Sequence, residues 1–393
     1  MVICDYAQCT GCCACINICG KDAISMTVDQ FGKSIPKINA DKCVSCGACK
    51  KVCPVSCTVA KTMPQKAFAV WSYDSEDKRK SSSGGVAAVV GRKVISQGGV
   101  VFGCAAIDGE VKHISAHTKD EAEVFRGSKY VQSYAGLIYR EVKSCLKENK
   151  KVLFVGTPCQ VAALYSYLEK EYDNLYTIDL ICHGTPPIKY LEEHIKDAIG
   201  EKKWSSVSFR GQYDWKLTVF DKNKILYQRD RHSDLYFRAF LDAVTYRENC
   251  YQCSYACPER CGDMTIGDFW GLDKSALDTP YDGNISLVLT NTTHGIHMIS
   301  QCESDFYIQE RPLEEAMNEQ QWNLLHPSVA PKDRKIFLEM YPQVGFDKAV
   351  EYTKIGKKVK QTYKKSCFDS SLFGRLYNFT KRAIGFVYRK IKR

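Results

Sequence analysis

The chain begins with two runs of four cysteines that share one spacing. The first run, Cys9, Cys12, Cys15 and Cys19, has the pattern C-x2-C-x2-C-x3-C. The second run, Cys43, Cys46, Cys49 and Cys53, repeats the pattern at a constant offset of 34 positions and is followed by Pro54. Two-residue gaps let three thiolates of one run reach three irons of a cubane, while the fourth cysteine ligates the other cluster. The spacing therefore predicts a ferredoxin-type domain with two 4Fe-4S clusters.

On this logic the ligands cross between the runs. One cluster takes Cys9, Cys12, Cys15 and Cys53, and the other takes Cys43, Cys46, Cys49 and Cys19. Between the runs, residues 23–29 and 34–39 are strand-like and residues 30–33 form a turn, which predicts a hairpin. The alternative is a pair of zinc sites, which usually use two C-x2-C pairs for each ion. Cys4 and Cys57 lie outside the pattern, and we expect them to be packed thiols.

Six further cysteines form a second group of candidate ligands. Cys159 follows the strand-like residues 151–156 at the start of a helix, and Cys182 follows the strand-like residues 175–181. A helix N-terminus is expected to lower the pKa of the Cys159 thiol. The other four, in the pattern C-x2-C-x3-C-x3-C, are Cys250, Cys253, Cys257 and Cys261. They make a site of their own or supply two ligands to a site with Cys159 and Cys182, and a cluster is favoured over zinc.

Two polar segments are candidates for binding a ligand. Residues 81–96 read as a serine-rich cap, two glycines and a helix rich in alanine and valine. Free amides at such a helix start favour a phosphate group, although a simple cap is the plainer interpretation. Residues 125–133 combine Arg126, Lys129 and Tyr130 with several hydroxyl groups, and here the plainer interpretation is a solvated loop.

The pattern of elements predicts an α+β ferredoxin-like domain followed by an α/β body. Strand-like and helix-like stretches alternate from Met63 to about residue 330, as in α/β proteins. We expect the ferredoxin domain at 1–62 and the two parts of the body at 63–150 and 151–335. The second part carries the third iron-sulfur site. A basic tail at 350–393 completes the chain.

Composition narrows the class of protein. The sequence has 21 cysteines, but its N-terminus lacks the basic and apolar regions of an export signal, so we expect a reducing, cytoplasmic setting. No apolar run approaches the length that spans a bilayer. The net charge is +10, yet Lys354 to Arg393 alone carries 13 Lys or Arg against the single acid Asp369. A nearly neutral body argues against binding to nucleic acid.

The tail itself has the pattern of a basic amphipathic helix. Counted from Phe373 at helical periodicity, an apolar stripe comprises Leu376, Tyr377, Ile384, Val387, Tyr388 and Ile391. The opposite side carries Arg375, Arg382, Arg389 and Arg393. We expect this segment to dock on an anionic membrane surface, at the inner face of the membrane, or on an acidic partner. The alternative is that the stripe packs back onto the body.

Five motifs together resemble one protein family. They are Ser83-Gly84-Gly85, residues 127–133 (GSKYVQS), residues 156–160 (GTPCQ), the Cys250-x2-Cys253 pair and residues 267–271 (GDFWG). This set is similar to the coenzyme F420 hydrogenase/dehydrogenase beta subunit family, over roughly residues 1–330. The form of the segment around Cys182 and the basic tail resemble its bacterial branch, which is associated with surface-polysaccharide biosynthesis.

The resemblance implies FAD and one 4Fe-4S cluster in the body. Its ligands would be Cys159, Cys182, Cys250 and Cys253. FAD would be held by Ser83, Gly84, Gly85, Lys129, Tyr130 and Ser133, with Thr157 and Gln160 near it. His183, next to Cys182, is the candidate catalytic residue.

These features together predict an iron-sulfur flavoprotein oxidoreductase. A donor such as ferredoxin would supply electrons to the N-terminal clusters, and FAD would exchange hydride with a small organic substrate. The alternative function is an adapter subunit, which passes electrons to a partner enzyme and has no substrate of its own. A flavin with an open face, and turnover by the isolated chain, would favour the first function.

Overall fold

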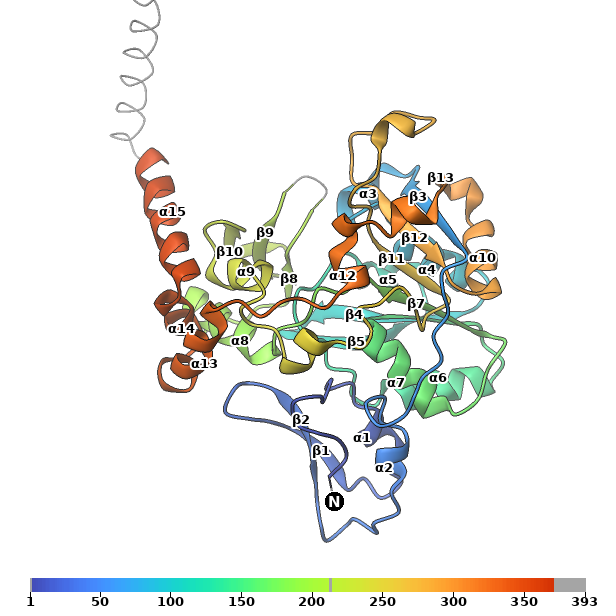
Figure 1. Ribbon diagram of the computed structural model, residues 1–393, viewed down its shortest axis with the longest axis horizontal. Coiled ribbons are helices and arrows are strands. Elements are labelled where there is room, and N and C mark those ends of the chain that lie inside the picture. Colours follow the sequence, from blue (N-terminus) through green and yellow to red (C-terminus); the bar gives the residue numbers. More distant parts are fainter. Residues whose placement is uncertain (1, 212–213, 371–393) are drawn as a thin grey trace, which may run out of the picture.

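The computed structural model describes residues 2–211 and 214–370 (Figure 1). Its N-terminal domain contains α1 (Ala14–Ile18), β1 (Ile24–Val28), β2 (Ser34–Ile38) and α2 (Ala48–Lys51). The two strands pair antiparallel, with Ile24 opposite Ile38, so the predicted hairpin is confirmed. The short helices α1 and α2 lie within the two cysteine runs and begin 34 residues apart, the same offset as the cysteines themselves.

The backbone of the two runs repeats as closely as their sequence does. Gly11 and Cys13 have φ angles of 65° and 68°, and the residues 34 positions later, Ser45 and Gly47, have φ angles of 56° and 77°. Left-handed conformations are costly for residues with a Cβ and cluster where a site requires them. Because Cys13 and Ser45 adopt them without being glycine, the loop geometry is fixed by the site that the loops surround.

The body is built on a mixed eight-stranded sheet in the order β13-β3-β12-β11-β7-β6-β4-β5. Its strands are β3 (Lys66–Ser72), β4 (Val100–Ile107), β5 (Glu110–Ala116), β6 (Val152–Gly156), β7 (Leu175–Leu180), β11 (Met264–Asp268), β12 (Ser286–Thr290) and β13 (Phe306–Arg311). The four central strands, β11, β7, β6 and β4, are parallel, and the outer pairs are antiparallel. The predicted α/β body is therefore confirmed, with antiparallel strands added at both edges.

Helices cover both faces of this sheet (Figure 1). On one face lie α4 (Val86–Ser96) and α10 (Thr293–Ser300), and on the other lie α6 (Ile138–Lys147) and α7 (Pro158–Leu168). Leu153 faces the first layer while its neighbour Phe154 faces the second, as the alternation of a strand requires. The N-terminal domain shares the second core, because Ile16 packs in the same cluster as Leu164.

A second lobe leaves the sheet after β7. It contains α8 (Ile188–Ile199), a three-stranded antiparallel sheet of β8 (Ser206–Ser208), β9 (Lys216–Asp221) and β10 (Lys224–Asp230), and then α9 (Leu235–Leu241). The chain returns to it with α13 (Asp333–Val344), α14 (Phe346–Tyr352) and α15 (Lys354–Ser370). The remaining helices are α3 (Ser75–Lys80), α5 (Lys119–Ala122), α11 (Leu313–Ala316) and α12 (Trp322–Leu325).

The first part of the predicted tail packs onto this second lobe. In α15, Val359 is 3% exposed and joins the core of the lobe, with Ile355 packed against it. The Arg229 guanidinium also lies 4.0 Å from the ring centre of Tyr363. The predicted amphipathic stripe from Phe373 onward lies outside the described residues. None of the described helices is both long enough and apolar enough to cross a membrane.

Candidate iron-sulfur and flavin site

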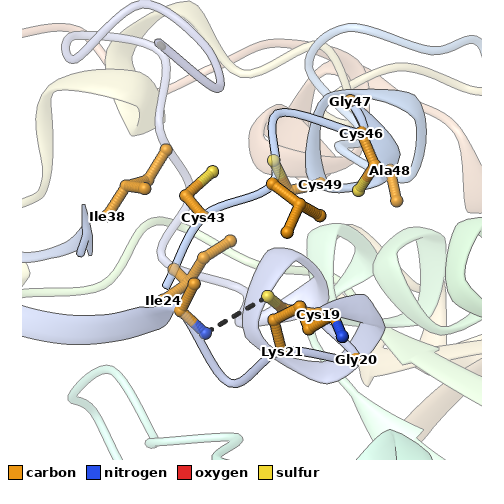
Figure 2. A pocket seen from close by; sticks show the side chains of 12 residues that line it. Cys19, Gly20, Lys21, Ile24, Ile38, Cys43, Cys46, Gly47, Ala48 and Cys49 are labelled. Carbon is orange, nitrogen blue, oxygen red and sulfur yellow. Dashed lines mark hydrogen bonds between the residues drawn. The ribbon is translucent and has the colours of Figure 1, made fainter. Parts of the chain in front are cut away.

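The first cavity of the N-terminal domain, the outer cavity, lies between the two cysteine runs. Figure 2 shows Cys43, Cys46 and Cys49 around it, with Cys19 from the other run completing the set. About 400 Å³ of space free of protein atoms lies within this cavity and its opening to solvent. The backbone N–H of Ala23 donates to the Cys19 sulfur over 3.3 Å, which fixes that side chain. Four thiols around one cavity match the ligand set of a cubane cluster.

The second cavity, the inner cavity, completes the crossed arrangement. It holds about 310 Å³ of space free of protein atoms, its opening included, and is lined by Cys9, Cys12, Cys15 and Cys53, as the spacing predicts. Cys4 and Cys13 also line it, so Cys4 is not simply a packed thiol elsewhere in the core. Hydrogen bonding from Cys4 lowers the pKa of Cys9 and that of Cys53 to about 6 each, which favours the thiolate form that binds iron.

The two cavities differ in their access to solvent. At the inner cavity, Cys12, Cys15 and Cys53 are each less than a tenth exposed. At the outer cavity Cys46 is exposed, and the neighbouring Val44 is 62% exposed. The exposed Lys21 lines this cavity, and the exposed Lys42 and Lys50 are next in sequence to its cysteines Cys43 and Cys49. The outer cavity therefore meets the surface, while the inner cavity faces the body.

Two arginines, the buried Arg247 and the half-buried Arg140, hold the N-terminal domain to the body. Arg247, 2% exposed, donates to the carbonyl oxygens of Cys9 at 2.9 Å and Ser34 at 3.2 Å, and to the Gln132 side chain. Arg140 donates to the carbonyl oxygens of Asn17 at 2.8 Å and of Cys19 at 3.0 Å. Neither arginine stands in a motif, so sequence reasoning missed both.

Four cysteines of the body gather at the carboxyl ends of the parallel strands. They are Cys159, after β6; Cys182, after β7; and Cys250 and Cys253, in a loop before β11. Burial raises the pKa of each of the four thiols. The pKa of Cys159 is raised further by the charges of the other three, Cys182, Cys250 and Cys253. This corrects the expectation for Cys159, whose pKa is raised because desolvation outweighs the helix N-terminus.

The other two cysteines of the loop point elsewhere. The Cys257 thiol donates to the carbonyl oxygens of Ser254 and Glu259 and accepts from the Lys61 ammonium at 3.4 Å. The Cys261 thiol donates to the Pro158 carbonyl at 3.3 Å. Of the two arrangements that the spacing allows, the structure brings together the one that includes Cys159 and Cys182.

A buried ion pair fixes the loop that carries Cys250 and Cys253. Arg260 and Asp179 are 1% and 0% exposed, and their closest nitrogen and oxygen lie 2.8 Å apart. Arg260 also donates to the carbonyl oxygens of Tyr255 at 3.0 Å and Leu180 at 3.1 Å. Leu180 ends β7 two residues before Cys182. The ion pair therefore connects the strand that leads to Cys182 with the loop that carries Cys250 and Cys253.

The segments predicted to hold FAD adjoin one another. The Ser128 N–H donates to the Ser82 hydroxyl over 2.7 Å, and the Gln160 amide donates to Ser133 over 3.0 Å. Ser133 also bonds to the His113 ring, and the Thr157 hydroxyl lies 3.2 Å from the Cys159 sulfur. The predicted FAD residues thus extend from the start of α4 to the body thiols.

Individual residues in these segments have both structural and candidate ligand roles. A Cβ at Gly84 would lie 2.2 Å from the Val70 carbonyl oxygen, so glycine is required there by packing against the sheet. Gly85 begins α4 with a φ of 91° and no side-chain cap. The Ser83 hydroxyl oxygen is buried and finds no hydrogen-bond partner among the described residues. The start of α4 therefore keeps free polar atoms.

Residues 125–133 are not a solvated loop. Lys129 donates from its ammonium group to the carbonyl oxygens of Val124 at 2.9 Å and Arg126 at 2.8 Å, and burial lowers its pKa to about 8. Tyr130 stacks on Phe240, with ring centres 4.6 Å apart. Arg126 pairs with the buried carboxylate of Asp77. This segment is therefore ordered, and it packs between the sheet and the second lobe.

His183 lies beside a buried ion pair that sequence reasoning did not single out. His183 is exposed, but surrounding protein atoms lower its pKa by desolvation; the Asp268 carboxylate opposes this effect, and Arg210 adds to it. Arg210 is 5% exposed at its side chain and pairs with Asp268 at the end of β11. Asp268 belongs to the GDFWG motif, and this motif was the sequence feature that could have identified the ion pair. A neutral imidazole can donate or accept one proton.

Within residues 2–211 and 214–370, no three His, Cys, Asp or Glu side chains are arranged to hold one metal ion. The two cysteine groups of the N-terminal domain surround cavities instead of a single point. Thiolates of a 4Fe-4S cubane bind separate irons, so the outer and inner cavities fit that group in ligand type and number.

Comparison with known proteins gives a family for each part of the chain. Residues 149–316 match the family that describes the C-terminal part of the beta subunit of coenzyme F420 hydrogenase/dehydrogenase. Residues 8–57 match the 4Fe-4S dicluster domain.

Two curated proteins are similar to parts of the chain. An uncharacterized protein of Methanocaldococcus jannaschii is 26% identical over 202 residues, which cover 44% of this chain and 56% of that protein. The match thus spans little more than half the length of this relative. Ferredoxin-3 of Rhodobacter capsulatus is 29% identical over 73 residues, covering 14% of this chain and 72% of the ferredoxin.

Among solved structures, the F420-reducing [NiFe] hydrogenase complex from Methanosarcina barkeri contains a chain with 18% identity and a TM-score of 0.43. The match covers 78% of this chain and 94% of that chain.

Proposed function

We propose that this chain, whose body belongs to the coenzyme F420 hydrogenase/dehydrogenase beta subunit family and follows a 4Fe-4S dicluster domain, is an iron-sulfur flavoprotein oxidoreductase. The observation that carries the proposal is the crossed pairing of the two cysteine runs around two cavities, with a third thiol group beyond the inner one. When bound, 4Fe-4S clusters would carry single electrons and FAD would exchange hydride.

The eight cysteines of the crossed runs would hold the N-terminal clusters, and the third group would hold one more. Its ligands would be Cys159, Cys182, Cys250 and Cys253. The exposed surface around Cys46 is the side from which an external redox protein would exchange electrons. The lysines Lys21, Lys42 and Lys50 would attract an acidic donor such as a ferredoxin.

The start of α4 and the loop that follows Arg126 would hold FAD. Free amides and the Ser83 hydroxyl at α4 would face its phosphates, as helix N-termini commonly do. Lys129 would add a positive charge, and Tyr130, Ser133, Thr157 and Gln160 would line the site toward Cys159. His183 would move a proton to or from an organic substrate, for which a surface-polysaccharide precursor is our proposed class.

Iron analysis with cysteine variants tests this proposal. Anaerobically purified protein should contain about twelve iron atoms per chain, as three 4Fe-4S clusters require. Cys15→Ser, Cys49→Ser and Cys253→Ser should each lose about four of them, with the other signals retained in electron paramagnetic resonance (EPR) spectra. The controls Cys57→Ser, whose thiol contacts the Ser166 hydroxyl at 3.3 Å, and Cys257→Ser should lose none. Stoichiometric zinc, or iron loss in Cys257→Ser but not Cys253→Ser, would refute the ligand assignment.

A flavin titration tests the FAD assignment. Lys129→Ala should weaken FAD binding by about tenfold, the scale of one lost hydrogen bond to a charged group. Because burial lowers the pKa of Lys129 to about 8, the attraction is present at neutral pH and should decline above pH 8. The measurement is flavin fluorescence at several pH values, with Lys112→Ala on the exposed edge strand β5 as control. Equal affinity of both variants across this pH range would contradict the assignment.

A further inference from the structure

Two buried tyrosines lie between the inner cavity and the body thiols. Tyr139, on α6, is 0% exposed. Its hydroxyl donates to the Cys12 carbonyl oxygen at 2.9 Å, and the Gln160 carbonyl oxygen lies at 3.3 Å. Cys12 lines the inner cavity, and Gln160 directly follows Cys159. One side chain thus contacts the backbone of both thiol groups.

Tyr255 makes a second connection from the opposite direction. It follows Cys253 by two positions and is 8% exposed. Its hydroxyl donates to the Pro54 carbonyl oxygen at 3.4 Å, and Pro54 directly follows Cys53 of the inner cavity. Tyr139 therefore reaches from helix α6 toward the N-terminal domain, and Tyr255 reaches there from the cysteine loop of the body.

The electrostatic surroundings of the two rings place them close to both thiol groups. Burial raises the pKa of Tyr139, and the charges of Cys12 and Cys159 both add to this effect. Burial also raises the pKa of Tyr255, with further contributions from Cys159 and Cys12. Both tyrosines are therefore influenced by Cys12 of the inner cavity and Cys159 of the body. Both hydroxyls act as hydrogen-bond donors, Tyr139 to the Cys12 carbonyl oxygen and Tyr255 to the Pro54 carbonyl oxygen.

We propose that Tyr139 and Tyr255 are positioning residues for electron transfer, which hold the inner cavity and the body thiols at a fixed short separation. This inference rests on the proposed function, because it requires clusters at both places. In the step that they would support, one electron would pass from a reduced cluster held at the inner cavity to an oxidised cluster held by the body thiols. No proton moves, since each hydroxyl keeps its bond to a carbonyl oxygen.

A third tyrosine provides a matched control. The Tyr190 hydroxyl, on α8, donates to the Phe31 carbonyl oxygen of the N-terminal domain at 2.7 Å. It is 2% exposed and so resembles Tyr139 in burial and in bond type. The charged neighbours that influence it are Tyr341, Arg334 and Asp29, not cysteines. Tyr190→Phe removes a bond between domain and body without touching the path between the thiol groups.

The test uses full-length holoprotein with Tyr139→Phe, Tyr255→Phe, both changes together, or Tyr190→Phe. Iron and sulfide content is measured first, and EPR spectra of the dithionite-reduced proteins then report the magnetic interaction between clusters. Rapid-freeze EPR after mixing with reduced ferredoxin gives the rate at which the body cluster becomes reduced. We expect the double variant to keep its iron, to lose part of the magnetic interaction, and to transfer electrons about tenfold to a hundredfold more slowly.

Each single change should lower the electron-transfer rate and the magnetic interaction less than the double change does. Tyr190→Phe should match the wild type in both. A double variant with full iron and wild-type rate and interaction would overturn the inference alone. So would an equal decrease in Tyr190→Phe. If Tyr139→Phe loses iron, Tyr255→Phe decides between these outcomes. Wild-type protein with iron for only two clusters would overturn the body cluster of the proposed function and this inference with it.

Discussion

Replacement of Asp179 by Asn is expected to lower the free energy of unfolding by about 3–5 kcal/mol, the usual cost of removing one partner of a buried ion pair. Asp179 is fully buried, and Arg260 would keep its charge without a counter-ion. Asp179 also accepts hydrogen bonds from the Gly262 N–H at 3.0 Å and the Thr265 hydroxyl at 2.7 Å. Asn offers one acceptor oxygen and no charge to replace these contacts.

The same change should release the cysteine loop, because Arg260 is held by Asp179 and in turn holds the Tyr255 carbonyl. Anaerobic urea unfolding gives the stability, and iron analysis should show loss of the body cluster alone. Glu76→Gln is the control, since Glu76 pairs with Arg79 at side-chain exposures of 58% and 65%. An exposed pair of this kind contributes about 0–1 kcal/mol. Similar losses in both variants, or full iron in Asp179→Asn, would contradict the prediction.

The N-terminal domain was predictable because its ligands are local in sequence. The repeat at an offset of 34 residues determines which cysteines share a cavity, and the hairpin between the runs brings the fourth ligand across. The central parallel strands were predictable for a similar reason. Cys159 and Cys182 each follow a strand, and adjacent parallel strands end at the same edge of a sheet.

The contacts between the two parts of the chain had no comparable local signal. Arg247 is separated by more than two hundred residues from Cys9, whose carbonyl oxygen it binds. Tyr139 lies in an ordinary amphipathic helix, and its role depends on α1 packing against α6. A single sequence gives no evidence for either pairing. The pKa of Cys159 was wrongly expected to fall because burial, which outweighs the helix N-terminus, is not visible in sequence.

The second lobe was hidden within the predicted segment at 151–335. Its strands β8, β9 and β10 are short, and their antiparallel pairing interrupts the alternation of strand and helix. The lobe is completed by α13 and α14, more than ninety residues after α9. Its core combines aliphatic side chains with many aromatic ones, among them Tyr236, Phe337 and Phe346. Only the folded chain brings these distant helices together.

A buried histidine links the distant helices of this lobe. His194, on α8, is 2% exposed and lies between two carboxylates. Its Nδ1 is 2.6 Å from Asp347 of α14, and its Nε2 is 3.1 Å from Asp234, which caps α9. Tyr227 of β10 donates to the same Asp234. Burial alone would lower the pKa of His194, but the two carboxylates outweigh it and raise the pKa to about 10.

This arrangement predicts a pH-dependent stability that a single substitution removes. The folded-state pKa of about 10 lies above the unfolded value of about 6.5, so protonated His194 stabilises the fold fully below pH 6.5. Between these values the stabilisation should fall by about 1.4 kcal/mol per pH unit, and it is lost above pH 10. Urea unfolding from pH 6 to 9 should show a shallower decline for His194→Gln than for the wild type. The exposed His232→Gln variant should keep the wild-type slope, and parallel slopes for His194→Gln and the wild type would show that His194 is not charged in the folded protein.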